Sequence, residues 1–189
     1  FLGYSNSVCI APQLKKEGYK IAHIEAGMRS YDKRMLEEIN RVVCDYCSDF
    51  LFVYHDNYKI KLFYEKINEG IYTVGNTIVE VLKKVHKNRK KKTLDYIVLD
   101  IHRPENFKYR ERLIHILDFA DNFEMPVKFL NFKRTMQYIK EFDIDMSLYK
   151  NIKIIDLLSY KKFIDLQYNA YCLISDSGTA QEEPALLNT

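Results

Sequence analysis

Several short segments of this 189-residue chain combine ionisable side chains with small residues, as expected where a protein binds an anion or moves a proton. His102 is followed directly by Arg103. Histidine changes its charge near neutral pH, and arginine binds phosphate through two parallel hydrogen bonds. The pair therefore predicts chemistry beside a phosphate, although such a pair also occurs in ordinary polar loops.

Ser177 and Gly178 precede a helical pattern that contains Glu183. Unpaired backbone N–H groups at a helix start attract phosphate, and glycine lets the phosphate approach closely. Glu183 follows shortly after the helix start, where a carboxylate could accept hydrogen bonds from ribose hydroxyls. A helix N-cap followed by first-turn acids explains the same pattern, so the residues alone leave both interpretations open.

Three further residues could supply proton transfer and a positive charge. Glu25 ends an otherwise apolar strand pattern, so it is either a general base or an ordinary solvated strand end. Glu37 and Arg41 are four residues apart on a predicted helix, where a surface ion pair worth about 0.3 to 0.5 kcal/mol is the simpler interpretation. Taken singly, none of these residues establishes a function.

All of these residues fall near the ends of predicted strands or the starts of predicted helices. Short apolar runs predict strands over residues 20–24, 50–54, 71–74, 96–99, 127–130, 152–155 and 171–174. Helical spacing predicts helices beginning near residue 35 and after residue 178, and over 57–66, 77–85, 110–122, 135–142 and 160–168. This alternation is typical of parallel sheets covered on both faces, which bind ligands beyond the carboxyl ends of their strands. The sequence therefore predicts an α/β fold of two Rossmann-like, doubly wound parallel-sheet halves.

A basic run over residues 83–92 marks the predicted boundary between the halves. Most such runs are solvated linkers, and contact with phosphate is the less favoured alternative. We expect residues 1–87 to form the C-terminal part of a first Rossmann-like domain and residues 88–93 to form a basic linker. Residues 94–189 are then most of a second Rossmann-like domain.

The composition excludes several classes of protein. The 29 basic and 26 acidic residues leave a formal net charge of only +3, which argues against a dedicated nucleic-acid binder. No apolar run approaches the roughly 18 to 20 residues that a membrane span needs, and no signal peptide is recognisable at Phe1. The four cysteines show no disulfide framework, so we expect reduced thiols and a cytoplasmic location.

Five motifs follow one another in an order that resembles one protein family. They are His-Ile-Glu-Ala-Gly at 23–27, Glu-Glu-Ile-Asn-Arg at 37–41, Gly-Asn-Thr at 75–77, His-Arg-Pro-Glu-Asn at 102–106 and Asp-Ser-Gly-Thr-Ala-Gln-Glu-Glu at 176–183. In order and approximate spacing they resemble the motifs of the non-hydrolysing UDP-N-acetylglucosamine 2-epimerases. The resemblance spans nearly the whole chain.

The resemblance implies a fold of the GT-B type, in which two Rossmann-like halves hold a UDP-sugar. It implies inversion at C2 of a UDP-HexNAc, either UDP-GlcNAc and UDP-ManNAc or a 6-deoxy analogue, by elimination and re-addition of UDP. It also implies a role in polysaccharide or glycan precursor synthesis and a possible homodimer. No metal, redox cofactor, nucleic acid or membrane partner is expected.

The resemblance also implies roles for single residues. Glu25 and Glu37 correspond to carboxylates implicated in proton transfer. His102 corresponds to a residue on the side of the leaving diphosphate, and we group it with the two carboxylates as catalytic.

The predicted substrate-binding residues are the remaining polar and small residues of the motifs. Arg41 corresponds to a second residue on the diphosphate side, and Arg103 could bind phosphate next to His102. Ser177 and Gly178 correspond to the phosphate-binding turn, and Glu183 corresponds to the contact with the uridine ribose.

The chain departs from the family at several places. Tyr4 stands where the family usually has a catalytic aspartate, and a tyrosine hydroxyl is a poor base at neutral pH. The family's opening strand with its Gly-Thr-Arg-Pro-Glu loop and its closing Arg-Pro-Glu segment are missing, so both halves are expected to be incomplete. Residues 131–134 keep only the arginine of the family's turn there.

These departures leave other functions open. We expect the chain alone to be inactive as an epimerase. The alternative is a truncated, catalytically inactive relative that at most binds UDP-sugar. A generic nucleotide-binding module that uses the basic run is a third and less favoured possibility.

Overall fold

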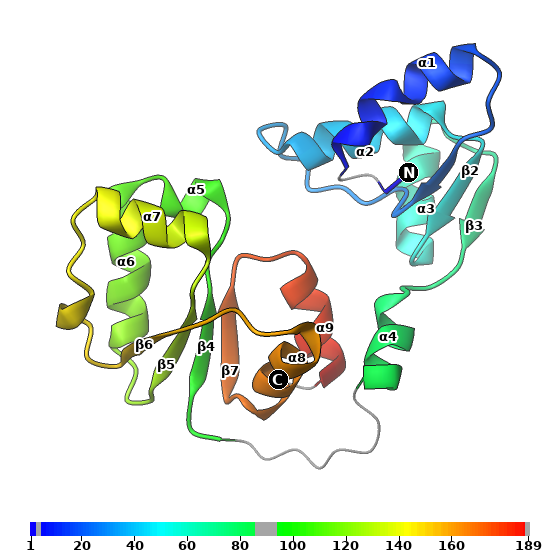
Figure 1. Ribbon diagram of the computed structural model, residues 1–189. Coiled ribbons are helices and arrows are strands. Elements are labelled where there is room, and N and C mark those ends of the chain that lie inside the picture. Colours follow the sequence, from blue (N-terminus) through cyan, green and yellow to red (C-terminus); the bar gives the residue numbers. More distant parts are fainter. Residues whose placement is uncertain (3–4, 86–93, 188–189) are drawn as a thin grey trace. The chain divides into compact units, whose positions relative to one another are not determined.

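The computed structural model describes residues 1–2, 5–85 and 94–187. Contacts within the chain divide it into two compact units, Phe1–Thr77 and Ile78–Thr189, and each unit has its own parallel sheet (Figure 1). Tyr4 and the predicted linker at 88–93 lie outside the described residues. Helix α4 (Ile78–Val85), expected in the first domain, is grouped by its contacts with the second unit.

The first unit is built on a three-stranded parallel sheet in the order β1-β2-β3. Its elements are the 3-10 helix η1 (Asn6–Ile10), α1 (Ala11–Lys16), β1 (Ala22–Ile24), α2 (Leu36–Cys47), β2 (Phe50–Val53), α3 (Asp56–Tyr64) and β3 (Ile71–Thr73). Leu2 makes an isolated parallel bridge with Ile24 at the end of β1. Leu62 of α3 packs with Leu51 and Val53 of β2 in the core.

The second unit is built on a four-stranded parallel sheet in the order β6-β5-β4-β7. Its remaining elements are β4 (Ile97–Asp100), α5 (Pro104–Phe107), α6 (Arg110–Asp121), β5 (Val127–Leu130), α7 (Lys133–Glu141), the 3-10 helix η2 (Met146–Leu148), β6 (Ile152–Ile155), α8 (Tyr160–Asn169), β7 (Cys172–Ser175) and α9 (Thr179–Leu187). Strand β4 pairs with a neighbour on each side and is buried along its whole length, which explains the apolar run at 97–99 before Asp100.

Helices cover both faces of the second sheet (Figure 1). On one face, Ile97 and Leu99 of β4 pack with residues of α5, α6 and α7, including Leu117. On the other face, Val98 packs with Phe163 of α8. Helices α4 and α9 pack against α8 through a small cluster formed by Leu82, Leu187 and Ile164.

The structure confirms the predicted α/β class and the parallel strands. All seven predicted strands are present, with bounds that differ slightly from the expected ones. The short helices α1 and α5 were not expected from the sequence. No helix among the described residues combines the length and apolar character needed to cross a membrane.

Candidate functional site

The structure places the predicted site residues in two groups, one in each unit. We call Glu25, Glu37 and Arg41 the first-unit site. We call the residues of the second unit, which are His102, Arg103, Ser177, Gly178 and Glu183, the second-unit site. Residues of each site directly follow parallel strands, where such sheets bind ligands.

Glu25 directly follows β1 and has an unusual backbone conformation. Its φ angle is 74°, in the left-handed region that residues other than glycine rarely adopt. Its side chain is 17% exposed, and its Oε2 atom lies 3.6 Å from Nη2 of Arg41. Backbone strain of this kind concentrates at functional sites, so the conformation supports the prediction that Glu25 is a functional residue.

Glu37 and Arg41 lie on the N-terminal half of α2. Glu37 is half-buried, and within the described residues no ion pair joins it to Arg41. Arg41 instead reaches back to Glu25 at the end of β1. The simpler interpretation of an ion pair between Glu37 and Arg41 is therefore wrong, and the helix contributes its arginine to the neighbouring strand end.

A buried carboxylate that the sequence did not single out holds the segment after β1. Asp45 of α2 is fully buried, with one carboxylate oxygen 2.6 Å from Nδ1 of His23. The other carboxylate oxygen accepts a hydrogen bond from the Gly27 amide at 3.2 Å and lies 2.7 Å from Nη2 of Arg29. Burial alone would lower the pKa of Arg29, but the hydrogen bonds and charges of Glu65 and Asp45 raise it. These contacts tie residues on both sides of Glu25 to α2.

Glu38 makes the second link between α2 and the preceding loop. Its buried carboxylate accepts hydrogen bonds from the backbone amides of Ser30 at 2.7 Å and Tyr31 at 3.1 Å. The two consecutive glutamates thus have different surroundings. Glu38 accepts hydrogen bonds from the backbone of the preceding loop, and Glu37 lies in the first turn of α2. The spacing of the sequence motif alone does not distinguish them.

The second-unit site forms because β4 and β7 are neighbours. Asp100 and Ser175 are paired at the ends of these strands, which brings the following residues together. The Asp176 carboxylate accepts hydrogen bonds from the backbone amides of His102 and Arg103, both at 3.0 Å, and from Nδ2 of Asn106 at 2.9 Å. Asp176 therefore anchors the whole turn that carries the histidine and the arginine.

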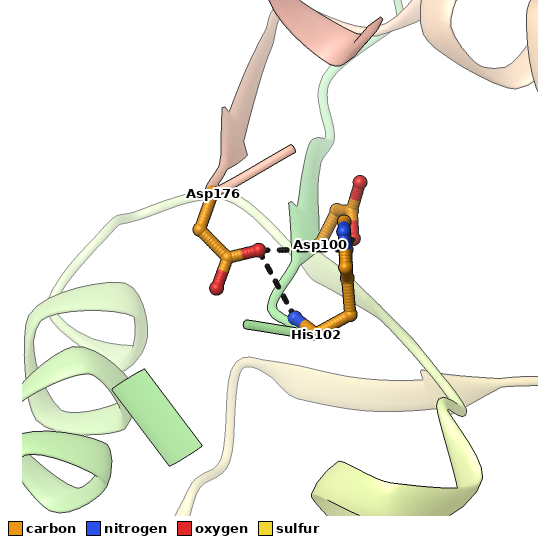
Figure 2. Close-up of side chains that lie close together, drawn as sticks. All are labelled: Asp100, His102 and Asp176. Carbon is orange, nitrogen blue, oxygen red and sulfur yellow. Dashed lines mark hydrogen bonds and ion pairs between the residues drawn. The ribbon is translucent and has the colours of Figure 1, made fainter. Parts of the chain in front are cut away.

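His102 is held between two carboxylates, as Figure 2 shows. Its Nδ1 atom lies 2.9 Å from Oδ1 of Asp100 and 3.4 Å from Oδ1 of Asp176. The hydrogen bond to Asp100 raises the pKa of His102, and the charges of Asp100 and Asp176 act in the same direction, against burial and Arg103. The side chain is 36% exposed, so the ring is accessible to a ligand, and the raised pKa favours its cationic form.

Asp100, His102 and Asp176 also have the composition of a metal site. One ligand atom from each lies within 4.8 Å of the other two. Hydrogen bonds already account for this arrangement, because N–H or O–H groups donate to both carboxylates. The expectation that the protein needs no metal stays a prediction.

Ser177 and Gly178 form the turn between β7 and α9. Ser177 is buried, and its backbone amide donates to Oγ of Ser175 at 3.0 Å. Among the described residues other than its chain neighbours, a Cβ atom added to Gly178 would come within 4 Å of one atom, Nη2 of Arg103 at 3.7 Å. The glycine thus leaves open space beside the Arg103 guanidinium.

Glu183 lies on α9 and is only 4% exposed. Its carboxylate accepts hydrogen bonds from the Tyr160 hydroxyl at 2.9 Å and from Nε2 of Gln167 at 3.3 Å. Burial and the Glu183 carboxylate raise the pKa of Tyr160, so the tyrosine remains a donor. Glu183 is therefore held in a fixed orientation by two residues of α8.

The remaining motif with possible chemistry is the pair Cys44 and Cys47 at the end of α2. All four cysteines are free in the structure, and Cys44 is buried. Burial raises the pKa of the Cys44 thiol to about 11, the opposite of what a reactive thiolate needs. Cys44 is therefore a small buried side chain and not a reactive thiol.

Comparison with known proteins shows which family shares these motifs. The sequence model of the UDP-N-acetylglucosamine 2-epimerase family matches residues 4–189. The chain is 37% identical to the UDP-N-acetylglucosamine 2-epimerase of Methanocaldococcus jannaschii, with 94% of this chain and 53% of that protein covered. It is 38% identical to the protein of the same name from Methanococcus maripaludis, with 92% of this chain and 52% of that protein covered.

The fold agrees with the sequence comparison. The chain is similar to the crystal structure of the Methanocaldococcus jannaschii UDP-GlcNAc 2-epimerase in complex with UDP-GlcNAc and UDP, with a TM-score of 0.85 and 36% sequence identity. The match covers 100% of this chain and 57% of the chain in that crystal structure. The chain thus spans about half the length of the relatives it matches. It belongs to the UDP-N-acetylglucosamine 2-epimerase family and has the family's α/β fold of the GT-B type.

Proposed function

We propose that this chain is a UDP-N-acetylglucosamine 2-epimerase-like protein that binds a UDP-HexNAc for inversion at C2. The observation that carries the proposal is the second-unit site. There a histidine with a raised pKa lies next to an arginine and an open glycine turn at the ends of β4 and β7. The related crystal structure holds UDP-GlcNAc and UDP, which supports a UDP-sugar ligand for this chain.

Each residue of the second-unit site has a part in binding this ligand. Cationic His102 and Arg103 offset the charge of the diphosphate, and hydrogen bonds to charged groups are the stronger ones in proteins. The space beside Gly178 admits a phosphate close to the Arg103 guanidinium. Glu183, fixed by Tyr160 and Gln167, accepts hydrogen bonds from the ribose hydroxyls.

The reaction needs proton transfer on both faces of one carbon. A base removes the proton from C2, the electron pair forms a double bond between C1 and C2, and UDP leaves with the electrons of the C1–O bond. UDP then re-forms that bond while a proton is delivered to the opposite face of C2. We assign these proton transfers to Glu25 and Glu37 and the diphosphate side to Arg41 and His102, as general acid–base catalysis with electrostatic stabilisation of the leaving group.

A second candidate function is binding of UDP-sugar without turnover. It is favoured by Tyr4, which stands where the family usually has a catalytic aspartate. We therefore expect the 189-residue chain alone not to interconvert UDP-GlcNAc and UDP-ManNAc. A cytoplasmic location, a role in polysaccharide or glycan precursor synthesis and a homodimer are further proposals that rest on the family resemblance.

Calorimetric titration with UDP-GlcNAc at neutral pH tests the binding proposal. His102→Gln removes the cationic ring and is expected to weaken binding roughly tenfold or more, the cost of losing a hydrogen bond to a charged group. Lys150→Gln is the control for loss of a cation, because Lys150 is exposed and precedes β6, at the sheet edge opposite the second-unit site. Equal binding by the two variants would contradict the assignment of His102.

Product analysis by NMR separates the two candidate functions. UDP-GlcNAc is incubated with the wild-type chain and with Glu25→Gln, and formation of UDP-ManNAc is followed. Absence of product together with measurable binding supports the binding-only candidate. Product formation that Glu25→Gln abolishes would instead establish the chain as an active epimerase.

A further inference from the structure

Asp100 is a buried carboxylate in the second-unit site that no motif assignment explains. It is the last residue of β4 and is 3% exposed. Its Oδ1 atom lies 2.9 Å from Nδ1 of His102, and its Oδ2 atom accepts a hydrogen bond from Oγ of Ser175 at 3.0 Å. Its backbone carbonyl accepts a hydrogen bond from the Asp176 amide at 3.1 Å. Asp100 is thus fixed from three directions, and one carboxylate oxygen is directed at the histidine.

This contact determines which nitrogen of His102 carries a proton. An ionised carboxylate only accepts hydrogen bonds, so Nδ1 must donate to Asp100. In the neutral ring the lone pair is then on Nε2, and in the cationic ring Nε2–H becomes a second donor. Because Nδ1 is occupied, Nε2 is the nitrogen through which the partly exposed ring can meet a ligand.

We propose that Asp100 is a positioning residue, which holds the His102 ring in one orientation with Nδ1 protonated and keeps the ring cationic for an anionic ligand. The proposal rests on the proposed function only for the nature of that ligand, a nucleoside diphosphate sugar. The hydrogen bond itself, and the tautomer it selects, belong to the unliganded protein.

Asp176 is the nearest alternative for this role, and its contacts differ. Its carboxylate already accepts two backbone amides and the Asn106 side chain, and it lies 3.4 Å from Nδ1 of His102. Asp176 therefore fixes the backbone of the turn, whereas Asp100 acts on the imidazole ring. The Phe132 ring, with its centroid 5.1 Å from that of His102, packs beside the imidazole without adding charge.

The charges around His102 define the pH range in which the pair acts. Asp100 raises the pKa of His102 most, Asp176 adds to the effect, and burial and Arg103 oppose it. The pKa of His102 is higher in the folded protein than in the unfolded chain. The stabilisation of the fold by the contact between cationic His102 and Asp100 is therefore fully present below the ordinary histidine pKa and is lost as pH rises through the raised value. Ligand binding that depends on the cationic ring should weaken over the same upper range.

NMR of the 189-residue chain tests the proposal without relying on activity. The ring nitrogens of His102 are followed through a pH titration in the wild type, in Asp100→Asn and in the control Asp156→Asn. Asp156 is an exposed carboxylate just after β6, so the control makes the same change of charge beyond another strand of the sheet. We expect the wild-type neutral ring to carry its proton on Nδ1, and the pKa of His102 to fall in Asp100→Asn but not in the control.

Two results would overturn the proposal. One is a neutral His102 that carries its proton on Nε2 in the wild type, a measurement that stands even if Asp100→Asn does not fold. The other is an equal His102 pKa in Asp100→Asn and in the wild type.

Binding of UDP-GlcNAc provides the functional readout. Its diphosphate does not titrate near neutral pH, so a pH-dependent affinity reports on the protein. At a pH between the His102 pKa values of the wild type and Asp100→Asn, the variant should bind roughly tenfold more weakly, and the difference should shrink at lower pH. No binding by the wild type would contradict the proposed function but leave the NMR test of Asp100 intact, whereas a pH-independent affinity difference would contradict the positioning role.

Discussion

At the scale of single residues, Gly178 and Gly70 differ in whether packing within the protein requires a glycine. Its φ angle is not in the left-handed region, and the contact that the described part of the chain offers to an added Cβ is the Arg103 guanidinium, at ordinary contact distance. Gly70 is the opposite case, because its φ angle is 70° and an added Cβ would collide with the carbonyl oxygen of Asp49. The protein's own packing therefore explains Gly70 but not Gly178.

Gly178→Ala is expected to leave folding intact and to weaken UDP binding. Alanine at a compatible position raises the free energy of unfolding slightly, by about 0.4 to 1 kcal/mol, because it restricts the unfolded chain. The added methyl group occupies the space assigned to a phosphate, so affinity for UDP should fall. Chemical denaturation and calorimetry on the variant check both parts.

Gly70→Ala provides the contrast for that experiment. It should lower the free energy of unfolding, because of both the collision and the left-handed backbone. If Gly178→Ala bound UDP as well as the wild type, the phosphate would not lie at this turn.

At the scale of elements, buried polar and charged groups join α2 to β1 and to the loop that follows β1. Asp45 on α2 contacts His23 of β1 and the Gly27 amide and Arg29 in the loop that follows. The side chains of Asp45 and Arg29 are 0% and 1% exposed. Removing Asp45 leaves the buried His23 ring and the Gly27 amide without their acceptor, whereas Arg29 keeps its ion pair with Glu65. A buried donor that loses its partner incurs its full desolvation cost.

Asp45→Ala is therefore expected to destabilise the first unit by roughly 1 to 3 kcal/mol for each buried group left without its acceptor. Asp32→Ala is the matched control, because Asp32 forms an exposed ion pair with Arg34 in the same unit and exposed pairs contribute little. Urea denaturation followed by circular dichroism measures both variants. Similar denaturation midpoints for the two would show that the Asp45 network does not hold β1 and α2 together.

The elements were predictable where they bury continuous or periodic apolar side chains. The apolar run that predicts a strand at 96–99 forms β4, which is buried along its length. Helix α5 was not predicted, because its four residues are too few to show a periodic pattern. Helix α1 is similarly short, and Ala11 is its single buried residue.

The supporting carboxylates of the sites were less predictable than the motif residues. Asp100 appears in the sequence only as the polar end of a strand, and its contact with His102 depends on the backbone turn between them. Asp45 lies between Cys44 and Cys47, and nothing in the sequence marks it as a partner of His23. Asp176 follows the strand next to β4, so the rule that parallel strands share their carboxyl edge could have placed it beside His102.

At the scale of the whole molecule, the near-balanced charge fits a small anionic ligand better than a polymeric one. A net charge of +3 provides no general basic surface, and the cationic residues of the sites are few and individually placed. The chain spans about half of its relatives, yet it contains residues assigned to both proton transfer and UDP binding. Specific UDP binding by this chain is therefore the central claim.

Calorimetric titration of the 189-residue chain with UDP, compared with inorganic diphosphate, tests this claim most directly. We predict saturable binding of one UDP per chain and weaker binding of diphosphate, because we assign the ribose contact to Glu183 and the phosphate contacts to His102 and Arg103. Equal affinity for the two ligands, or no saturable binding of UDP, would contradict the account.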